Sequence, residues 1–108
     1  MNETKLKKET GNINNYVKEA EDKLEQALLS ARAGLFEDSD RYLEQSNQAV
    51  EKGNIVVNQL AKENPDEPVS FMFVNGMGRL NRVSGMLKMA SEIIFLYKKL
   101  NKDFLHFG

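Results

Sequence analysis

The stretch VSFMFVNGMGRLNRVSGMLKMASEIIFLYKKL (residues 69–100) decides the fold of this chain. It contains no proline and follows Pro68, a residue tolerated in the first turn of a helix but not in its interior, so we expect one long helix from Val69 to about Lys102. The first half of that helix is apolar on nearly every side, at Val69, Phe71, Met72, Phe73, Val74, Met77 and Leu80. A helix that is apolar all round is normally buried all round, and two further helices would cover only part of it. The stretch therefore predicts a partner surface, most simply a second copy of the same chain.

Two amphipathic helices are expected ahead of this stretch. In the first, over about residues 12–33, apolar residues recur in steps of three and four and so share one side of the helix. They are Ile13, Tyr16, Val17, Ala20, Leu24, Ala27, Leu28, Ala31 and Leu35. Gly34 is expected to end this helix in the left-handed conformation. The second helix covers about residues 37–62, and Gly53 in its middle weakens it by about 1 kcal/mol relative to alanine.

The segment ENPDEP (63–68) separates the second helix from the third, because neither Pro65 nor Pro68 fits a helix interior. The sequence therefore predicts an all-α protein, a three-helix, up-down-up antiparallel bundle. We expect a single domain over residues 12–105, preceded by a polar extension (1–11), frayed or helical, and followed by a short tail (106–108).

The composition excludes several classes of protein. Of the 108 residues, 41% are hydrophobic and 29% are charged, which is typical of a folded chain and not of a disordered one. The 15 lysines and arginines nearly balance the 16 aspartates and glutamates, so the sequence favours neither nucleic-acid binding nor a polybasic membrane surface. Cysteine is absent and His106 is the only histidine, which excludes disulfides, thiolate nucleophiles and sites that need two histidines. We expect no metal and no cofactor.

Signals for export or membrane insertion are also missing from the sequence. No apolar run approaches the roughly 18 residues that span a bilayer, and the charged first residues lack the apolar segment of a signal peptide. With no export signal and no cysteine, the chain is expected to be cytoplasmic and not to insert into a membrane.

The charges are divided unevenly along the chain. Residues 1–68 carry 9 basic and 14 acidic groups, a net charge of −5, whereas residues 69–108 carry 6 basic and 2 acidic groups, a net charge of +4. Two interpretations stay open. The acidic helices can pair with the basic one inside the bundle, or Arg79, Arg82 and Lys88 can form a docking face for an acidic partner.

The order of these segments also resembles a known family. Two helices joined at ARAGLFEDSDRYLEQSNQAV (31–50), a break that contains proline, and a last helix ending in SEIIFLYKKL (91–100) are similar to the lactose/cellobiose-type IIA component of the bacterial sugar phosphotransferase system. The similarity covers roughly residues 13–102. It implies a three-helix bundle that assembles as a homotrimer, accepts a phosphoryl group on a histidine early in its last helix, and passes that group to a sugar-specific IIB partner.

The functional positions of that family are changed in this chain. The family's motif Val-His-Ala-Gln-Asp-His-Leu-Met aligns with the residues from Val74 to Asn81, VNGMGRLN. The resemblance thus places Asn75 at the phosphate-accepting histidine, Gly78 at the aspartate that binds a metal, and Arg79 at the second histidine. A carboxamide nitrogen is a poor nucleophile because its lone pair is delocalised into the carbonyl, and glycine offers no ligand atom.

Two interpretations of the changed motif stay open. Arginine grips phosphate in a bidentate fork, so Asn75, Arg79 and Arg82 are candidate residues for binding phosphate or a partner without accepting a phosphoryl group. Alternatively, the changes are drift in a surface freed from catalysis.

The resemblance therefore implies a pseudoenzyme of the sugar-transport system. We expect a IIA-like subunit that does not accept phosphate and acts by regulation or interaction, with a IIB-type protein or another protein as its partner. Two alternatives stay open: an active carrier that uses His106 or another residue, and an unrelated helical adaptor such as a secretion chaperone. The sequence identifies neither the partner nor a sugar.

Overall fold

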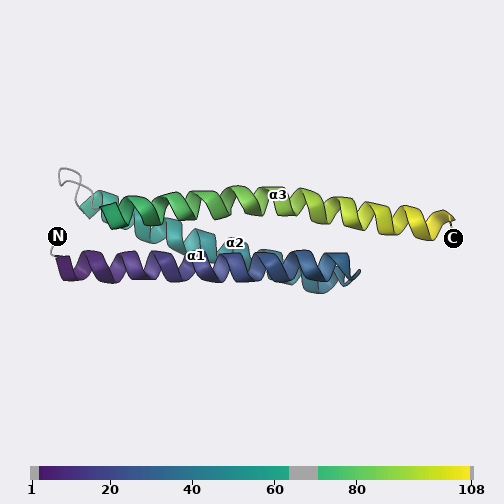
Figure 1. Cartoon of the computed structure of the whole chain (residues 1–108), viewed down its shortest axis with the longest axis horizontal. Coiled ribbons are helices and arrows are strands. Elements are labelled where there is room, and N and C mark those ends of the chain that lie inside the picture. The colour runs from purple at the N-terminus through teal and green to yellow at the C-terminus, as the bar shows by residue number, and fades with distance from the viewer. Residues whose placement is uncertain (1–2, 64–70, 108) are drawn as a thin grey trace.

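The computed structural model describes the backbone of residues 3–63 and 71–107 and the side chains of residues 4–63 and 71–102. Over these ranges the chain forms three helices, α1 (Glu3–Arg32), α2 (Phe36–Glu63) and α3 (Phe71–Phe107). Figure 1 shows α1 and α3 running in the same direction, with α2 running back antiparallel to both. The predicted all-α, up-down-up three-helix bundle is confirmed for the described residues.

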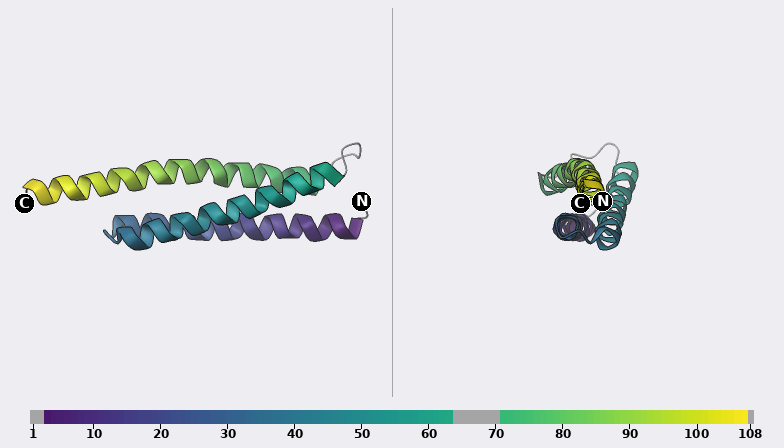
Figure 2. Two further views of the ribbon diagram at one scale, coloured as in Figure 1. Left: turned by 180° about the vertical axis from the view of Figure 1, so that it is seen from behind. Right: turned by 90° about the vertical axis from the view of Figure 1, so that its right-hand side faces the viewer.

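The bundle is a rod whose principal extents are 63 × 18 × 17 Å. α1 and α2 pack along one another more extensively than either packs on α3. Figure 2 shows α2 slanting from the end of α1 towards the beginning of α3, while the C-terminal end of α3 projects beyond both other helices. Much of the surface of α3 therefore has no helix of the same chain beside it.

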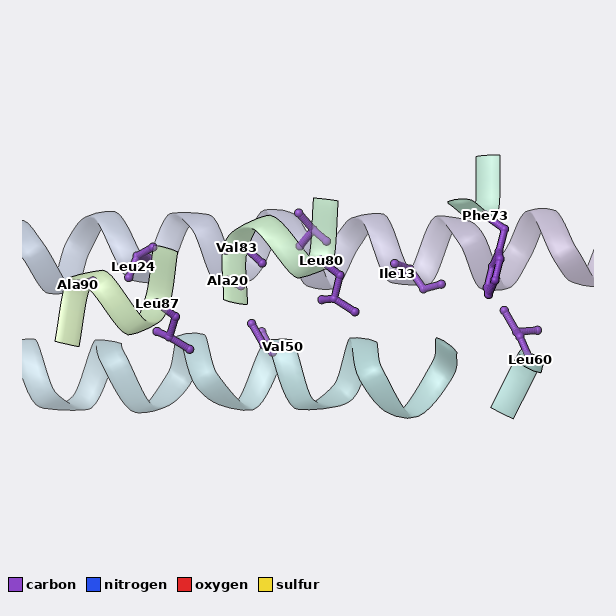
Figure 3. Packing of buried hydrophobic residues seen from close by; sticks show 12 residues of the cluster. Ile13, Ala20, Leu24, Val50, Leu60, Phe73, Leu80, Val83, Leu87 and Ala90 are labelled. Atoms are coloured by element: carbon purple, nitrogen blue, oxygen red, sulfur yellow. The ribbon is translucent and has the colours of Figure 1, made fainter. Parts of the chain in front are cut away.

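The core is a column of apolar side chains where the three helices meet, all of them aliphatic except Phe73 (Figure 3). α1 buries most of the predicted stripe, at Ile13, Val17, Ala20, Leu24, Ala27 and Ala31. α2 contributes Ala49, Val50 and Leu60. α3 contributes Phe73, Leu80, Val83, Leu87, Ala90 and Ile94. On α1 these positions recur in steps of three and four, as they do on α3 from Leu80 onward, and burying them against the other helices stabilises all three together.

The turn between α1 and α2 is set by Gly34. This glycine has a φ of +79°, a left-handed conformation that residues with a Cβ adopt only at a cost. The backbone N–H of Leu35 donates to the carbonyl of Ser30 at 2.8 Å, and the N–H of Gly34 donates to the carbonyl of Ala31 at 3.0 Å. These two hydrogen bonds satisfy carbonyls at the end of the helix, as in a Schellman motif. The predicted helix stop at Gly34 is confirmed.

The outer helix boundaries extend beyond those expected from the sequence for the first and last helices. The N-terminal extension was expected to be frayed or helical, and the structure shows the helical alternative, with α1 beginning at Glu3. Leu6 packs against the core that contains Leu60 and Phe73, and Thr10 is buried. This long-range apolar contact stabilises the first turns of α1 as a helix. At the other end, α3 runs to Phe107 instead of ending near residue 102. The expected break at Pro65 and Pro68 lies outside the described residues.

Two glycines allow neighbouring helices to come close. α2 continues through Gly53, where an added Cβ would lie 2.9 Å from Cδ1 of Leu80. On α3, a Cβ added at Gly76 would lie 3.4 Å from Cγ2 of Ile13. Both glycines are buried. Gly53 therefore leaves space for the Leu80 side chain, and Gly76 lets α3 approach α1.

Candidate interaction surface on the third helix

α3 carries a partly exposed apolar stripe beside its buried face. We call it the outer stripe. Its members are spaced by three and four residues and are between 40% and 64% exposed: Met86, Met89, Ile93, Leu96 and Leu100. Each of the first three precedes a buried residue, Leu87, Ala90 or Ile94, by one position. Because successive residues are rotated by about 100° on a helix, the outer stripe lies directly beside the buried stripe rather than opposite to it.

The outer stripe has the spacing of a helix-packing seam. Apolar residues in alternating steps of three and four are the pattern with which one long helix packs along another. Folded monomers rarely expose large contiguous apolar patches, and those that do usually bind something there. Apolar exposure at the start of α3 adds to this surface, because Phe71 is 85% exposed and Met72 and Val74 are also exposed.

The three candidate residues from the sequence lie on the N-terminal continuation of this stripe. Counting back from Met86 by four, three and four residues reaches Arg82, Arg79 and Asn75. Asn75 and Arg82 are exposed, and Arg79 is half-buried. The structure therefore places all three on one face of one helix, as a polar end to an otherwise apolar seam.

Arg79 is held by a residue that the sequence analysis missed. Its Nη1 donates a hydrogen bond of 3.2 Å to Oδ1 of Asn14 on α1. The close approach of α3 to Ile13 at Gly76 brings Asn14 within reach of Arg79, one turn further along α3. Asn14 follows a core residue by one position, so it lies at the edge of the α1 stripe. This position beside the core was the only feature of the sequence that could have drawn attention to Asn14, and it does not indicate that Asn14 contacts Arg79.

The acidic and basic helices are joined sparsely by ion pairs. Among the described residues, α3 pairs with an acidic helix through Lys98, whose Nζ lies 2.8 Å from Oδ1 of Asp40. Arg79 is bound to a neutral amide, and Arg82 and Lys88 form no hydrogen bond or ion pair within that part of the chain. Ion pairing within the bundle therefore neutralises Lys98. The positive charges of Arg79, Arg82 and Lys88 have no such ion pair among the described residues, so they can interact with another molecule.

Two other positions of the changed motif, Asn75 and Gly78, are exposed to solvent. Gly78 is exposed, with no atom within 4 Å of an added Cβ, and Asn75 one turn earlier faces solvent. In the described part of the chain, no three His, Cys, Asp or Glu side chains are grouped so that they could hold a metal ion. The backbone at His106 belongs to α3, but its side chain lies outside the described residues.

Two other features bear on possible ligands. A groove between α2 and α3 is lined by Asp40, Leu43, Glu44, Asn47, Leu87 and Ser91, and it contains none of the candidate residues. None of the helices, over the residues described, combines the length and the apolar character needed to cross a bilayer.

Comparison of the chain with protein-family models, with curated proteins and with solved structures finds no match in any of the three.

Proposed function

We propose that this chain is a helical interaction subunit that self-associates through the outer stripe of α3. The observation that carries the proposal is the row of exposed apolar side chains from Met86 to Leu100 at the spacing of a helix-packing seam. A second copy is the simplest partner, because the same seam on another α3 offers apolar side chains at the same spacing. A homotrimer is the assembly that the family resemblance implies.

The size of the stripe bears on the strength of such an assembly. Fully burying a large aliphatic side chain contributes about 1.5–3 kcal/mol, so burying the exposed half of each stripe residue contributes roughly 1 kcal/mol. Five residues from each of two copies then contribute on the order of 10 kcal/mol, against a loss of translational and rotational freedom on the order of 4–15 kcal/mol. The outer stripe alone thus supports modest affinity, and other groups on α3 can decide whether the assembly forms.

We further propose that the subunit resembles phosphotransferase IIA proteins of the lactose/cellobiose type without accepting a phosphoryl group. Support comes from the bundle order and from Asn75, whose exposed carboxamide stands where the resemblance expects an imidazole. An amide can donate a hydrogen bond to phosphate but cannot carry it as a phosphohistidine does. A regulatory role in the cytoplasm, opposite a IIB-type or other protein partner, follows from this resemblance.

A phosphorylation assay tests the second proposal. The wild-type chain is incubated with phosphoenolpyruvate, radiolabelled in its phosphate, and the general phosphotransferase proteins, beside the Asn75→His variant. We expect no acid-labile label on the wild type and label on the variant, because the substitution restores a nucleophilic nitrogen. Stoichiometric label on the wild type would overturn the proposal, and its loss in His106→Ala would assign the acceptor to His106.

Sedimentation velocity over a range of concentrations tests self-association. Leu96 and Phe95 are adjacent on α3 and are 56% and 64% exposed, but only Leu96 belongs to the outer stripe. We expect Leu96→Glu to abolish association and Phe95→Glu, which adds the same charge one position away, to preserve it. A monomer at all concentrations for the wild type, or equal loss in both variants, would contradict the proposed seam.

A further inference from the structure

Two arginines that form no ion pair within the described residues continue the outer stripe at its N-terminal end. Arg79 and Arg82 continue it in the same steps of three and four, directly N-terminal to Met86. Arg82 forms no hydrogen bond or ion pair within the described residues, and Arg79 is bound by the neutral Asn14. The nearest carboxylate on α3 is Glu92, ten residues beyond Arg82 and thus roughly 15 Å along the helix axis. No acidic group on this helix therefore neutralises either arginine.

Self-association through the outer stripe, the proposed function on which this inference rests, brings these charges together. If copies of α3 pack in parallel around a symmetry axis, residues at the same position approach one another. Each apolar residue of the outer stripe then contacts the same residue of the neighbouring copy. Arg79 and Arg82 likewise approach Arg79 and Arg82 of the neighbouring copy. Several guanidinium groups close together repel unless an anion lies between them.

We propose that packing of the outer stripes is coupled to the binding of a phosphate-sized oxyanion by Arg79 and Arg82 of neighbouring copies. A guanidinium presents five N–H donors in a planar fork that matches the oxygens of phosphate. The anion would neutralise the convergent charges and add hydrogen bonds that exist only in the assembly. Association and anion binding would then strengthen each other, as two linked equilibria must.

Asn14 is the positioning residue of this site. Its Oδ1 accepts a hydrogen bond from Nη1 of Arg79, which restricts the arginine to one side and leaves its other N–H groups for the ligand. Because Asn14 is neutral, it orients the guanidinium without cancelling its charge. A carboxylate in that position would occupy the arginine as an ion pair and weaken its hold on an anion.

The opposite arrangement of the helices predicts a different behaviour. If two copies pack antiparallel about the middle of the stripe near Ile93, the arginines of one copy lie far from those of the other. Phosphate would then have no site between them and no effect on association. The response to phosphate therefore distinguishes the two orientations.

The experiment is sedimentation velocity of the full chain in sodium chloride and in millimolar sodium phosphate, at equal pH and equal ionic strength. Equal ionic strength makes general screening the same in both buffers. We expect phosphate to tighten association by about tenfold, a typical size for a coupling between two sites. We expect Arg79→Gln/Arg82→Gln to associate equally in both buffers, because the repulsion and the ligand site are both removed. Asn14→Ala should keep association but lower the phosphate response.

A matched control is Lys88→Gln/Lys102→Gln, which removes two charges from α3 at positions outside the outer stripe and should keep the full phosphate response. Replacing inorganic phosphate by O-phosphoserine tests whether a phosphate monoester serves as well as the free ion, and a response to either one supports the proposal. Equal association of the wild type in both buffers would overturn the anion coupling while leaving self-association intact. A phosphate response that persists in the double arginine variant would also overturn it, because general salting-out would then be the cause. If the wild type sedimented as a monomer in every buffer, the proposed self-association itself would be contradicted.

Discussion

The hydroxyl of Ser46 on α2 donates a hydrogen bond of 2.7 Å to the backbone carbonyl of Ala20 on α1, and both residues are buried. Two helical turns away, Ser39 donates to the carbonyl of Ala27 at 2.8 Å in the same way. The two serines are seven residues apart on α2, and the two alanines are seven residues apart on α1. The same bond therefore repeats along the α1–α2 contact. Small side chains at all four positions allow the helix backbones to come close enough for these bonds.

Replacing Ser46 by alanine removes one of these bonds and leaves a buried carbonyl lone pair without its donor. We expect Ser46→Ala to lower the free energy of unfolding by about 1 kcal/mol, the usual size for one buried hydrogen bond. The control is Ser91→Ala, because Ser91 donates to the carbonyl of Leu87 within its own helix and is exposed. Urea denaturation measures both variants, and an equal change in the two would show that the α1–α2 bonds are not special.

Gly53 and Gly85 should respond in opposite directions to alanine. An alanine in an exposed helix position is about 1 kcal/mol more favourable than glycine, and Gly85 has open space around it. Gly85→Ala is therefore expected to stabilise the protein. At Gly53 the new methyl group would lie 2.9 Å from Cδ1 of buried Leu80, and overpacking of about 1–3 kcal/mol outweighs the gain in propensity. Gly53→Ala is expected to destabilise.

The overpacking can be tested through its neighbour. In a Leu80→Ala background the obstructing side chain is absent, so Gly53→Ala should become neutral or stabilising. A double-mutant cycle by thermal unfolding measures this coupling. If Gly53→Ala destabilised equally in both backgrounds, contact with Leu80 would not be the cause.

The adjacent residues Ile93 and Ile94 separate folding from association. Ile94 is 2% exposed and packs against Ala27 and Ala31, so Ile94→Ala should lower the free energy of unfolding by about 2–5 kcal/mol. Ile93 belongs to the outer stripe and is 40% exposed, so Ile93→Ala should affect folding little and weaken association. Denaturation of dilute protein and sedimentation velocity measure the two effects. Equal destabilisation of the monomer by both variants would contradict this division of α3.

The pair of Lys5 and Glu63 predicts a pH dependence at the N-terminal end of the bundle. Nζ of Lys5 lies 2.9 Å from Oε2 of Glu63, and this hydrogen bond and the carboxylate charge raise the pKa of Lys5 above 10.5. Because the folded-state pKa is raised, the stabilisation is fully present below pH 10.5 and is lost as the pH rises through the raised pKa. An NMR titration of Lys5 should show its pKa fall in Glu63→Gln and stay raised in Glu51→Gln.

Several features of the fold follow from local patterns in the sequence. The steps of three and four from Ile13 to Ala31 predict the buried face of α1, and a glycine after the last periodic residues predicts the turn at Gly34. These inferences succeed because amphipathic periodicity and the left-handed preference of glycine act over a few neighbouring residues. Local patterns left open whether the N-terminal extension is frayed or helical. Residues 3–11 are polar except for Leu6, and they are helical in the structure, where Leu6 packs against the core.

The candidate surface was only partly predictable. Apolar residues all around the start of the last helix indicated a partner surface there, whereas the outer stripe lies further along the helix, from Met86 to Leu100. The changed motif marked Asn75, Arg79 and Arg82. Periodicity does not say which of two adjacent stripes faces the core, because Ile93 and Ile94 belong to stripes with the same spacing. Nor does it connect Asn14 with Arg79, which are 65 residues apart in the chain.

The amino-acid sequence by itself determined the three helices, their order and the turn that joins the first two, because periodicity and glycine conformation are local properties of the chain. Only the tertiary structure decided which face of α3 is covered, why Gly53 is needed opposite Leu80, and how Asn14 holds Arg79. These depend on where two other helices end and how closely they approach. α1 and α2 cover one side of α3 and stop short of its C-terminal end, which leaves the outer stripe exposed beside the core.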